Sequence, residues 1–449
     1  MDTRLAMTAW ALVCGLTGAV HGEGNSTAAP LGKRFFDLAN GYSLRPPAGL
    51  DFKQEYSPSR LATWSARDDA TGAIAWTFRV LRAVESDSYV EPSAHVKTLR
   101  HRLEGKDKFK LESIELIQVA GWLAIELAGQ SDQPAGQYNR QLWVQSQAGQ
   151  FVIFSIAGPI DRRARLDAVF KSILDTLDIF DPQQFQQRRQ ENLAQGRQLL
   201  EGLNQRRIEG IADGVERFLL ITIAGQPVGF VRTRIDLEHH QQVPAVKVLT
   251  LTWMDSPDSN PSIARQELLA RLDHQHETWM ETVVSGTGPS SHIASEAGSR
   301  EGQLITVDIT SGPRRSRQVK AIPAEILNVY LSRSIGVIMP SLLEQSIQTA
   351  YAFAVFNTQA GEFDVRTIAV AGPEQITVGD QTLDAVRITD QVAEDVEPTV
   401  LWLDRDGHAV RILSNGGLVL QAATQQQVLS AFPAQREHIE GPLTQPGAR

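Results

Sequence analysis

Short segments of strand-like composition recur at close spacing through the second half of the chain, and this recurrence limits the folds available to it. The segments are rich in β-branched and aromatic residues, and turn residues separate them. They lie at residues 218–223, 230–237, 246–254, 304–310, 352–357, 362–371, 383–390, 400–404, 408–413 and 419–423. The glycine-bracketed turn at 225–229 and the Asp-Arg-Asp-Gly turn at 404–407 are typical of hairpins. Roughly ten closely spaced strands predict one large antiparallel curved sheet or open barrel over residues 214–430.

The first half of the chain mixes strands with amphipathic helices. Strands are expected at residues 35–38, 62–66, 73–82, 121–127, 140–146 and 150–157. Apolar residues three and four apart predict helices at 93–103 and 161–177. Residues 33–182 are therefore expected to form an antiparallel sheet with packed helices, which makes the fold class α+β.

Residues 183–210 are rich in Gln and Arg and are predicted to be a linker helix between two domains. Gly196 and Gly202 weaken this helix by roughly 1 kcal/mol each relative to alanine, and a flexible linker is the alternative. Residues 263–272 and 324–331 are candidate short helices. A chain of 449 residues is too long for one core, so two domains are expected.

Residues 1–22 have the pattern of a secretory signal peptide. Arg4 precedes an uncharged apolar run at 5–20, and small residues follow it. A retained signal anchor is the alternative. The single cysteine, Cys14, lies inside this leader, too deep for lipid attachment, so cleavage near Glu23 would leave a mature chain without a thiol. Export without cysteine fits a bacterial periplasmic or secreted protein.

The charge distribution excludes two classes of partner. The chain carries a formal net charge of −9, and acidic side chains outnumber basic ones after residue 210. Binding to nucleic acid rests on Lys and Arg that neutralise phosphates, so a nucleic-acid partner is not expected. The same excess argues against docking on anionic lipid, and no apolar run after the leader is long enough for a transmembrane segment.

Residues 33–182 resemble a known group of small domains. The motifs are F-x-x-x-x-G-Y-S-L-R-P-P-A-G-L at 36–50, F-V-I-F-S-I-A at 151–157 and F-K-S-I-L-D-T-L at 170–177. They resemble the PsbP/Mog1/DcrB-like group. The resemblance implies an antiparallel sheet with helices packed on it, and a non-enzymatic binding or assembly role. It supplies no active-site residue.

Two motifs of the second half carry another resemblance. I-x-x-A-G-Q-P-V-G-F-V-R at 221–232 and L-W-L-D-R-D-G-H-A-V-R-I at 401–412 are similar to curved-sheet domains related to the lipoprotein carriers LolA and LolB and to DUF3108-type proteins. Residues 255–300 have no counterpart in this resemblance.

Recognisable catalytic and metal-binding patterns are few. Histidines cluster at 238–240 and 273–277, but the zincin pattern His-Glu-x-x-His is not present, and neither a metal nor a cofactor is expected. No nucleophile motif or phosphate-binding loop is found. The hydroxyl and histidine residues at 286–292 leave one alternative open, an exported hydrolase with a site in residues 273–292.

The aromatic residues of the second half are the candidate ligand-binding groups. Trp253, Trp279, Phe353 and Trp402 fall on or beside predicted strands, where a concave face would give an apolar groove. Ordinary core packing is the alternative for each. The sequence thus predicts an exported, non-catalytic envelope protein that binds a hydrophobic ligand or a protein partner. A structural interaction protein is a further alternative to the hydrolase.

Overall fold

The computed structural model describes most of the chain after the leader. It describes residues 30–54, 59–68, 70–84, 91–105, 109–132, 135–147, 149–255, 261–286, 291–379, 381–414 and 417–443. The predicted signal peptide at 1–22 lies outside these residues. The described residues divide into two compact units, one up to residue 188 and the other from residue 189 onward. No helix of the described residues is long and apolar enough to cross a membrane.

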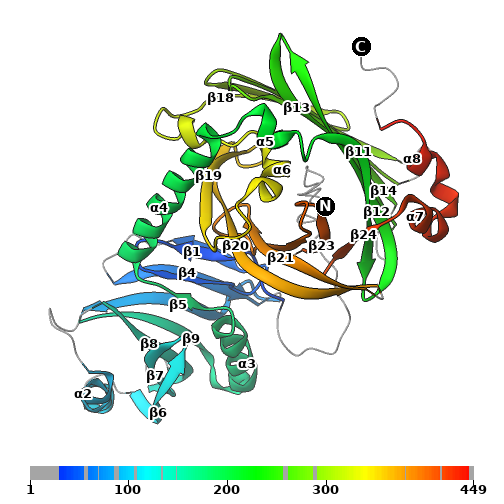
Figure 1. Ribbon diagram of the computed structural model, residues 1–449. Helices are drawn as coiled ribbons and strands as arrows, with labels where there is room; N and C mark the ends of the chain where they lie inside the picture. The colour runs from blue at the N-terminus through cyan, green and yellow to red at the C-terminus, as the bar shows by residue number, and fades with distance from the viewer. Residues whose placement is uncertain are drawn as a thin grey trace. The chain divides into compact units, whose positions relative to one another are not determined.

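The first unit is built on a 7-stranded antiparallel sheet (Figure 1). In spatial order its strands are β3 (Asp51–Gln54), β4 (Arg60–Arg67), β5 (Ile74–Val84), β9 (Gln150–Pro159), β8 (Ala135–Gln147), β7 (Trp122–Asp132) and β6 (Phe109–Val119). A smaller sheet contains β1 (Phe35–Asp37), β2 (Tyr42–Leu44) and β10 (Asp178–Ile179). The predicted antiparallel sheet is confirmed, and β6 is a strand that the sequence analysis did not identify.

The two main helices of this unit pack on opposite faces of the sheet. Successive strand residues point to opposite faces, and the buried residues of β9 divide in this way. Phe154 belongs to the core that includes α3 (Arg163–Leu174), whereas Ile153 belongs to the core that includes α2 (Pro92–Gly105). Both helices match the predicted amphipathic segments. A 3₁₀ turn, η1 (Ile160–Arg162), leads into α3.

The Gln- and Arg-rich segment is helical, as predicted. It forms α4 (Pro182–Glu201) and the short α5 (Gln205–Ile208). Gly196 allows α4 to approach the second unit's sheet closely, because a Cβ there would lie 2.1 Å from the carbonyl oxygen of Ala352. Packing therefore explains a glycine that costs helix propensity.

The second unit contains a 14-stranded open antiparallel sheet, which confirms the predicted α+β class. From one edge to the other its strands are β18 (Arg314–Ala321), β17 (Leu304–Ser311), β16 (His292–Glu301), β15 (His276–Ser285), β14 (Ser262–Arg271), β13 (Val243–Met254), β12 (Gln226–His240), β11 (Asp213–Ile223), β24 (Val419–Ala423), β23 (Ala409–Leu413), β22 (Thr399–Leu403), β21 (Gln381–Gln391), β20 (Glu362–Val378) and β19 (Ala350–Asn357).

Residues 263–272 were predicted to be helical, and this prediction is wrong. They fall largely in β14, which pairs along its whole length with β13 and β15. The alternating burial of Ala264, Gln266 and Leu268 shows period 2 rather than helical spacing. The second candidate helix, at 324–331, is reduced to a 3₁₀ turn, η3 (Leu327–Val329).

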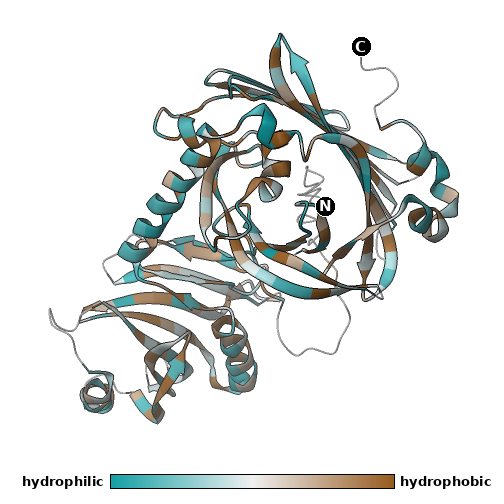
Figure 2. Cartoon of the chain, in the orientation of Figure 1, coloured by the Kyte–Doolittle hydropathy of each residue, from teal (hydrophilic) through white to brown (hydrophobic). Residues whose placement is uncertain are grey.

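The sheet curves around α6 (Arg333–Leu342), which lies against its concave face (Figure 1). Ile335, Ile338 and Met339 of α6 are buried in the unit's largest core together with residues of most strands of the 14-stranded sheet. Figure 2 shows α6 as mainly hydrophobic, in contrast to the mainly hydrophilic α4. The concave face is thus an apolar interior that α6 covers.

Three short elements near the C-terminus cover part of the opposite, convex face. They are α7 (Gln425–Ala431), η4 (Pro433–Gln435) and α8 (Arg436–Glu440). Val428 and Ile439 pack with Phe230 and Leu251 of the sheet. Arg232 holds α8 in place because its guanidinium donates to the carbonyl oxygens of His438 and Gly441.

Candidate functional site

A row of polar side chains crosses four neighbouring strands on the concave face. Thr250 of β13 pairs in register with Gln266 of β14, Gln266 with Glu281 of β15, and Glu281 with Glu296 of β16. All four residues are buried. They share their face with Trp279, which belongs to the core around α6.

A second row, four residues away along β15 and β16, adds two more charged groups. Glu277 of β15 lies opposite Arg300 of β16. The side chain of Glu277 accepts hydrogen bonds from the backbone N–H of Arg333 and from the hydroxyl of Tyr330, at 3.1 Å for the latter. The guanidinium of Arg300 lies 4.5 Å from the centre of the Tyr330 ring. Burial raises the pKa of Glu277 and lowers the pKa of Arg300.

We call Glu277, Glu281, Glu296, Arg300 and Arg333 the interior charged cluster. Within it, Glu296 is fully partnered. One of its carboxylate oxygens lies 2.7 Å from Nη2 of Arg333 and accepts a hydrogen bond of 2.8 Å from the Trp279 indole. The other oxygen accepts a hydrogen bond of 2.9 Å from the Thr358 hydroxyl. Three donors on two oxygens make this a satisfied buried carboxylate.

Trp279 links the charged groups to the apolar part of the concave face. The Arg333 guanidinium lies over its ring, 4.5 Å from the centroid. Gly298 of β16 lies directly opposite Trp279, and a Cβ at this glycine would come within 2.0 Å of the indole. The indole therefore occupies the space that glycine leaves open on the neighbouring strand.

Glu281 differs from the other carboxyl groups of the cluster because neither of its side-chain oxygens has a hydrogen-bond partner among the described residues. Glu281 is only 1% exposed to solvent. The pKa of Glu281 is raised to about 8, mainly by burial and also by the adjacent Glu296, while Arg333 and the Gln266 side chain oppose the shift. Nη1 of Arg333 is also buried without a partner.

The four aromatic residues predicted to bind a ligand do not lie together. Trp279 and Phe353 both belong to the core around α6 on the concave face. Trp253 faces the opposite side, in the core under α7 and α8, where its ring lies 4.9 Å from that of Phe432. Trp402 is in a separate small cluster with Val410. The four residues therefore belong to three separate clusters, and ligand binding by these residues stays a prediction. Only Trp279 and Phe353 share the core on the concave face.

The histidine-rich segment contributes histidines with different surroundings. His274 occupies a turn with a positive φ of 55°, and burial lowers its pKa. His276 begins β15, stacks on His240 at 4.5 Å between ring centres, and lies 2.7 Å from the Glu301 carboxylate. Residues 287–290 of the proposed hydrolase segment lie outside the described residues. The hydrolase alternative thus stays untested.

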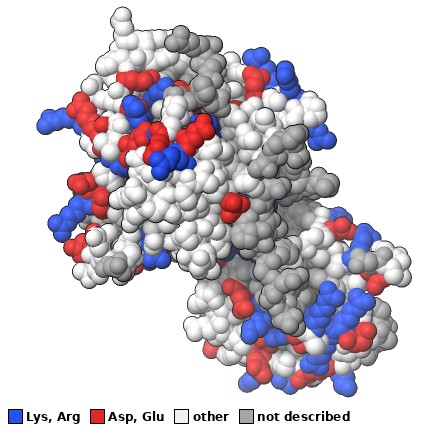
Figure 3. Space-filling view, turned by 90° about the vertical axis from the view of Figure 1, so that its right-hand side faces the viewer, with Lys and Arg blue, Asp and Glu red and all other residues white. Residues whose placement is uncertain are grey.

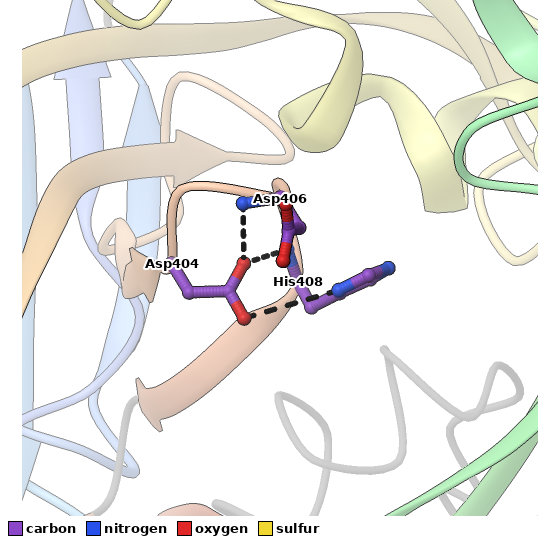
Figure 4. Close-up of side chains that lie close together, drawn as sticks. All are labelled: Asp404, Asp406 and His408. Carbon is purple, nitrogen blue, oxygen red and sulfur yellow. Dashed lines mark hydrogen bonds and ion pairs between the residues drawn. The ribbon is translucent and has the colours of Figure 1, made fainter.

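The turn between β22 and β23 brings three potential metal ligands together, namely Asp404, Asp406 and His408 (Figure 4). The Asp404 carboxylate accepts hydrogen bonds from the backbone N–H groups of Asp406 and His408, as aspartate does in tight turns. His408 also lies 2.7 Å from the Arg217 guanidinium, a positive charge that opposes cation binding. The arrangement is accounted for by the turn itself.

The first unit has a polar surface hollow of about 250 Å³ next to α3. Arg140 lines this hollow, 2.8 Å from the Glu126 carboxylate and 2.9 Å from that of Asp167. The Tyr138 hydroxyl donates to Asp167 at 2.7 Å, and this acceptor and burial raise its pKa. Figure 3 shows acidic and basic side chains next to each other at several places on one face of the chain.

The interior charged cluster was not predicted from the sequence. Its signal was present in the alternation Glu277, Trp279, Glu281, Val283, which places two acidic residues on the same strand face as a tryptophan. A solvated strand face would not carry that tryptophan, so the mixture indicates a buried polar site.

Comparisons with known proteins give structural similarity over part of the chain. CyanoP, the PsbP of the cyanobacterium Synechocystis, is similar to 37% of this chain over 100% of its own length, with 16% identity and a TM-score of 0.26. A β-barrel-like DUF1849 protein from Brucella abortus covers 46% of this chain and 95% of its own, with 10% identity and a TM-score of 0.32.

A protein of unknown function from Pseudomonas aeruginosa is similar to 31% of this chain over 91% of its own length, with 14% identity and a TM-score of 0.19. No family model matches the chain in sequence, and no curated protein does. The expected likeness to PsbP is thus found as structural similarity over part of the chain. None of these proteins supplies a site residue.

Proposed function

We propose that this chain is an exported, non-catalytic envelope protein that binds a hydrophobic ligand on the concave face of its 14-stranded sheet. The observation that carries the proposal is the apolar interior covered by α6, in which Trp279 and Phe353 both lie. An apolar concave surface with a few polar groups at one end is the usual form of a site for an amphiphilic small molecule. The predicted resemblances to LolA, LolB and DUF3108-type domains agree with such a role.

Because α6 covers the concave face, a ligand bound there would either displace α6 or lie beside it. Its central residues are apolar, and Pro340 lies inside the helix, where it removes a backbone hydrogen bond. Its N-cap residue, Ser332, makes no side-chain capping bond. The helix is therefore held by its packing and by the bond from its first backbone N–H to Glu277 rather than by strong helix signals.

Native mass spectrometry and solvent extraction of the purified full chain test the proposal. We expect a co-purifying amphiphile, or binding of an added twelve-carbon alcohol, dodecanol. The variants Trp279→Phe and Phe353→Leu should weaken this binding because both side chains are on the concave face. Trp253→Phe and Trp402→Phe are matched controls, since their side chains belong to other clusters. Equal effects in both pairs, or no ligand at all, would exclude the concave face as a lipid site.

Export is a separate part of the proposal and has its own test. The apolar leader with Arg4 predicts cleavage close to Glu23 and loss of Cys14. N-terminal sequencing of protein recovered from the bacterial envelope, together with a thiol assay, measures both. A free or lipid-modified Cys14 in the exported form would contradict this prediction.

A further inference from the structure

With all three of its carboxyl groups ionised, the interior charged cluster would carry one surplus negative charge. It contains three carboxyl groups, from Glu277, Glu281 and Glu296, and two guanidinium groups, from Arg300 and Arg333. Elsewhere on the concave face, Arg366 and Asp390 form their own two-pronged pair, with distances of 2.8 and 2.5 Å. Because Arg366 and Asp390 offset each other, this pair provides no net charge to balance a third carboxylate in the cluster.

Glu281 is the carboxyl group of the cluster that lacks a partner. Glu277 and Glu296 each accept hydrogen bonds from two or more groups, whereas Glu281 accepts none from the described residues. A buried carboxyl without a partner carries the full desolvation cost of the group. Such a group is explained if its partner arrives from outside the protein.

We propose that the concave face binds amphiphiles whose polar end is a protonated amine, and that Glu281 is the ionic partner of that ammonium group. The proposal rests on the proposed function, because the apolar body of the ligand would lie against the core around α6. One added positive charge gives three cations for three carboxylates. The ammonium would then donate to the unoccupied oxygens of Glu281.

Electroneutrality distinguishes the amine from a fatty acid. Nη1 of Arg333 and a protonated Glu281 could both donate to a ligand carboxylate. That arrangement would leave three buried negative charges, from Glu277, Glu296 and the ligand, against two guanidiniums. Burying an unpaired charge is far more costly than burying a matched pair. The amine is therefore the ligand that completes the cluster.

Proton release by Glu281 couples amine binding to pH. The charged groups that face it are Glu296, which hinders its ionisation, and Arg333, which favours it. Because its pKa is raised to about 8, Glu281 is protonated in the free protein near pH 6. An ammonium must then displace this proton, so affinity should rise as the pH increases from 6 to 8.

Calorimetry with dodecylamine, dodecanol and dodecanoate, in the full chain at pH 8, tests the proposal. We expect dodecylamine to bind at least about tenfold more tightly than dodecanol, because a charge-assisted bond is added to the same apolar contact. Glu281→Gln keeps the size of the side chain and should remove this tenfold preference for dodecylamine over dodecanol. Glu267→Gln, on the opposite face of neighbouring β14, is the matched control and should keep the preference.

The outcomes separate the two proposals. If none of the three compounds binds, the proposed function fails. If dodecanol binds as tightly as dodecylamine, or dodecanoate binds best, the amine assignment is overturned while the hydrophobic site stands. An amine preference that survives Glu281→Gln would also overturn the assignment. Should this variant unfold, the pH dependence of dodecylamine binding to the unaltered chain decides, and no rise between pH 6 and 8 counts against Glu281.

Discussion

The two units of the chain both hold clusters of acidic and basic side chains, and they differ in access to water. In the surface hollow of the first unit, Arg140 lies between two carboxylates, and its side chain is 27% exposed. In the interior charged cluster of the second unit, Glu281 and Glu296 are each only 1% exposed. Water can solvate a surplus charge in the hollow, but not in the interior. An unmatched carboxyl therefore points to a missing partner only in the second unit.

Removing a partner from the interior should have the largest effect. Glu296→Ala would leave the Arg333 guanidinium, the Trp279 indole and the Thr358 hydroxyl without their acceptor. We expect the free energy of unfolding of the second unit to fall by about 3–5 kcal/mol. Urea unfolding followed by tryptophan fluorescence measures this loss. A change below about 1 kcal/mol would show that the cluster is solvated like the hollow.

Filling the space opposite Trp279 should have the next largest effect. Gly298→Ala places a methyl group against the indole, so Trp279 or β16 must move. Overpacking of this kind costs about 1–3 kcal/mol. The same unfolding experiment measures it, and Ala297→Gly, the neighbouring position on the other face of β16, controls for the general effect of changes in this strand. A cost for Gly298→Ala no larger than that of the control would contradict the close contact.

Glu281→Gln should change stability in a manner that depends on pH. The pKa of Glu281 is raised in the folded chain, so between about pH 5 and 8 the unfolded chain ionises this carboxyl while the folded chain keeps it protonated. Stability is therefore lost as the pH rises through this window. Glu281→Gln should remove the loss and be relatively more stable by about 3–4 kcal/mol at pH 8 than at pH 5. Parallel urea titrations at both pH values, with Glu267→Gln as the control, would show it.

The smallest effect is expected in the surface hollow. Arg163 is 45% exposed and lies 2.7 Å from Glu112, so solvent screens the pair. Arg163→Gln should cost about 0.2–1 kcal/mol at low salt and less in high salt. Unfolding of the first unit at two salt concentrations measures this. A salt-independent loss of several kcal/mol would remove the contrast between the two clusters.

More of the fold than of the candidate site could be predicted from the sequence. Period-2 and helical patterns located α2, α3 and most strands of the large sheet, because their core positions are occupied by apolar residues. The pattern failed in β14 to β16, where Gln266, Glu281 and Glu296 occupy core positions. A sequence does not distinguish a buried acidic residue from a solvated one. For this reason neither the strands β14 to β16 nor the interior charged cluster was predicted. Trp279 was identified because a large aromatic side chain stands out as apolar, whether it binds a ligand or packs in a core.

Strand β18 has a consequence for the protein at high concentration. It is an edge strand of the 14-stranded sheet, nearly all of its side chains are exposed, and four of its eight residues are Arg or Lys. The opposite edge, β19, is partly covered, because Ala354 accepts a hydrogen bond from the backbone N–H of Leu331. Adding the β18 edge of a second molecule would bring like charges into register and repel it. This open sheet can therefore keep an unpaired edge without assembling into fibrils, and neutralising those cations should make the protein prone to aggregate.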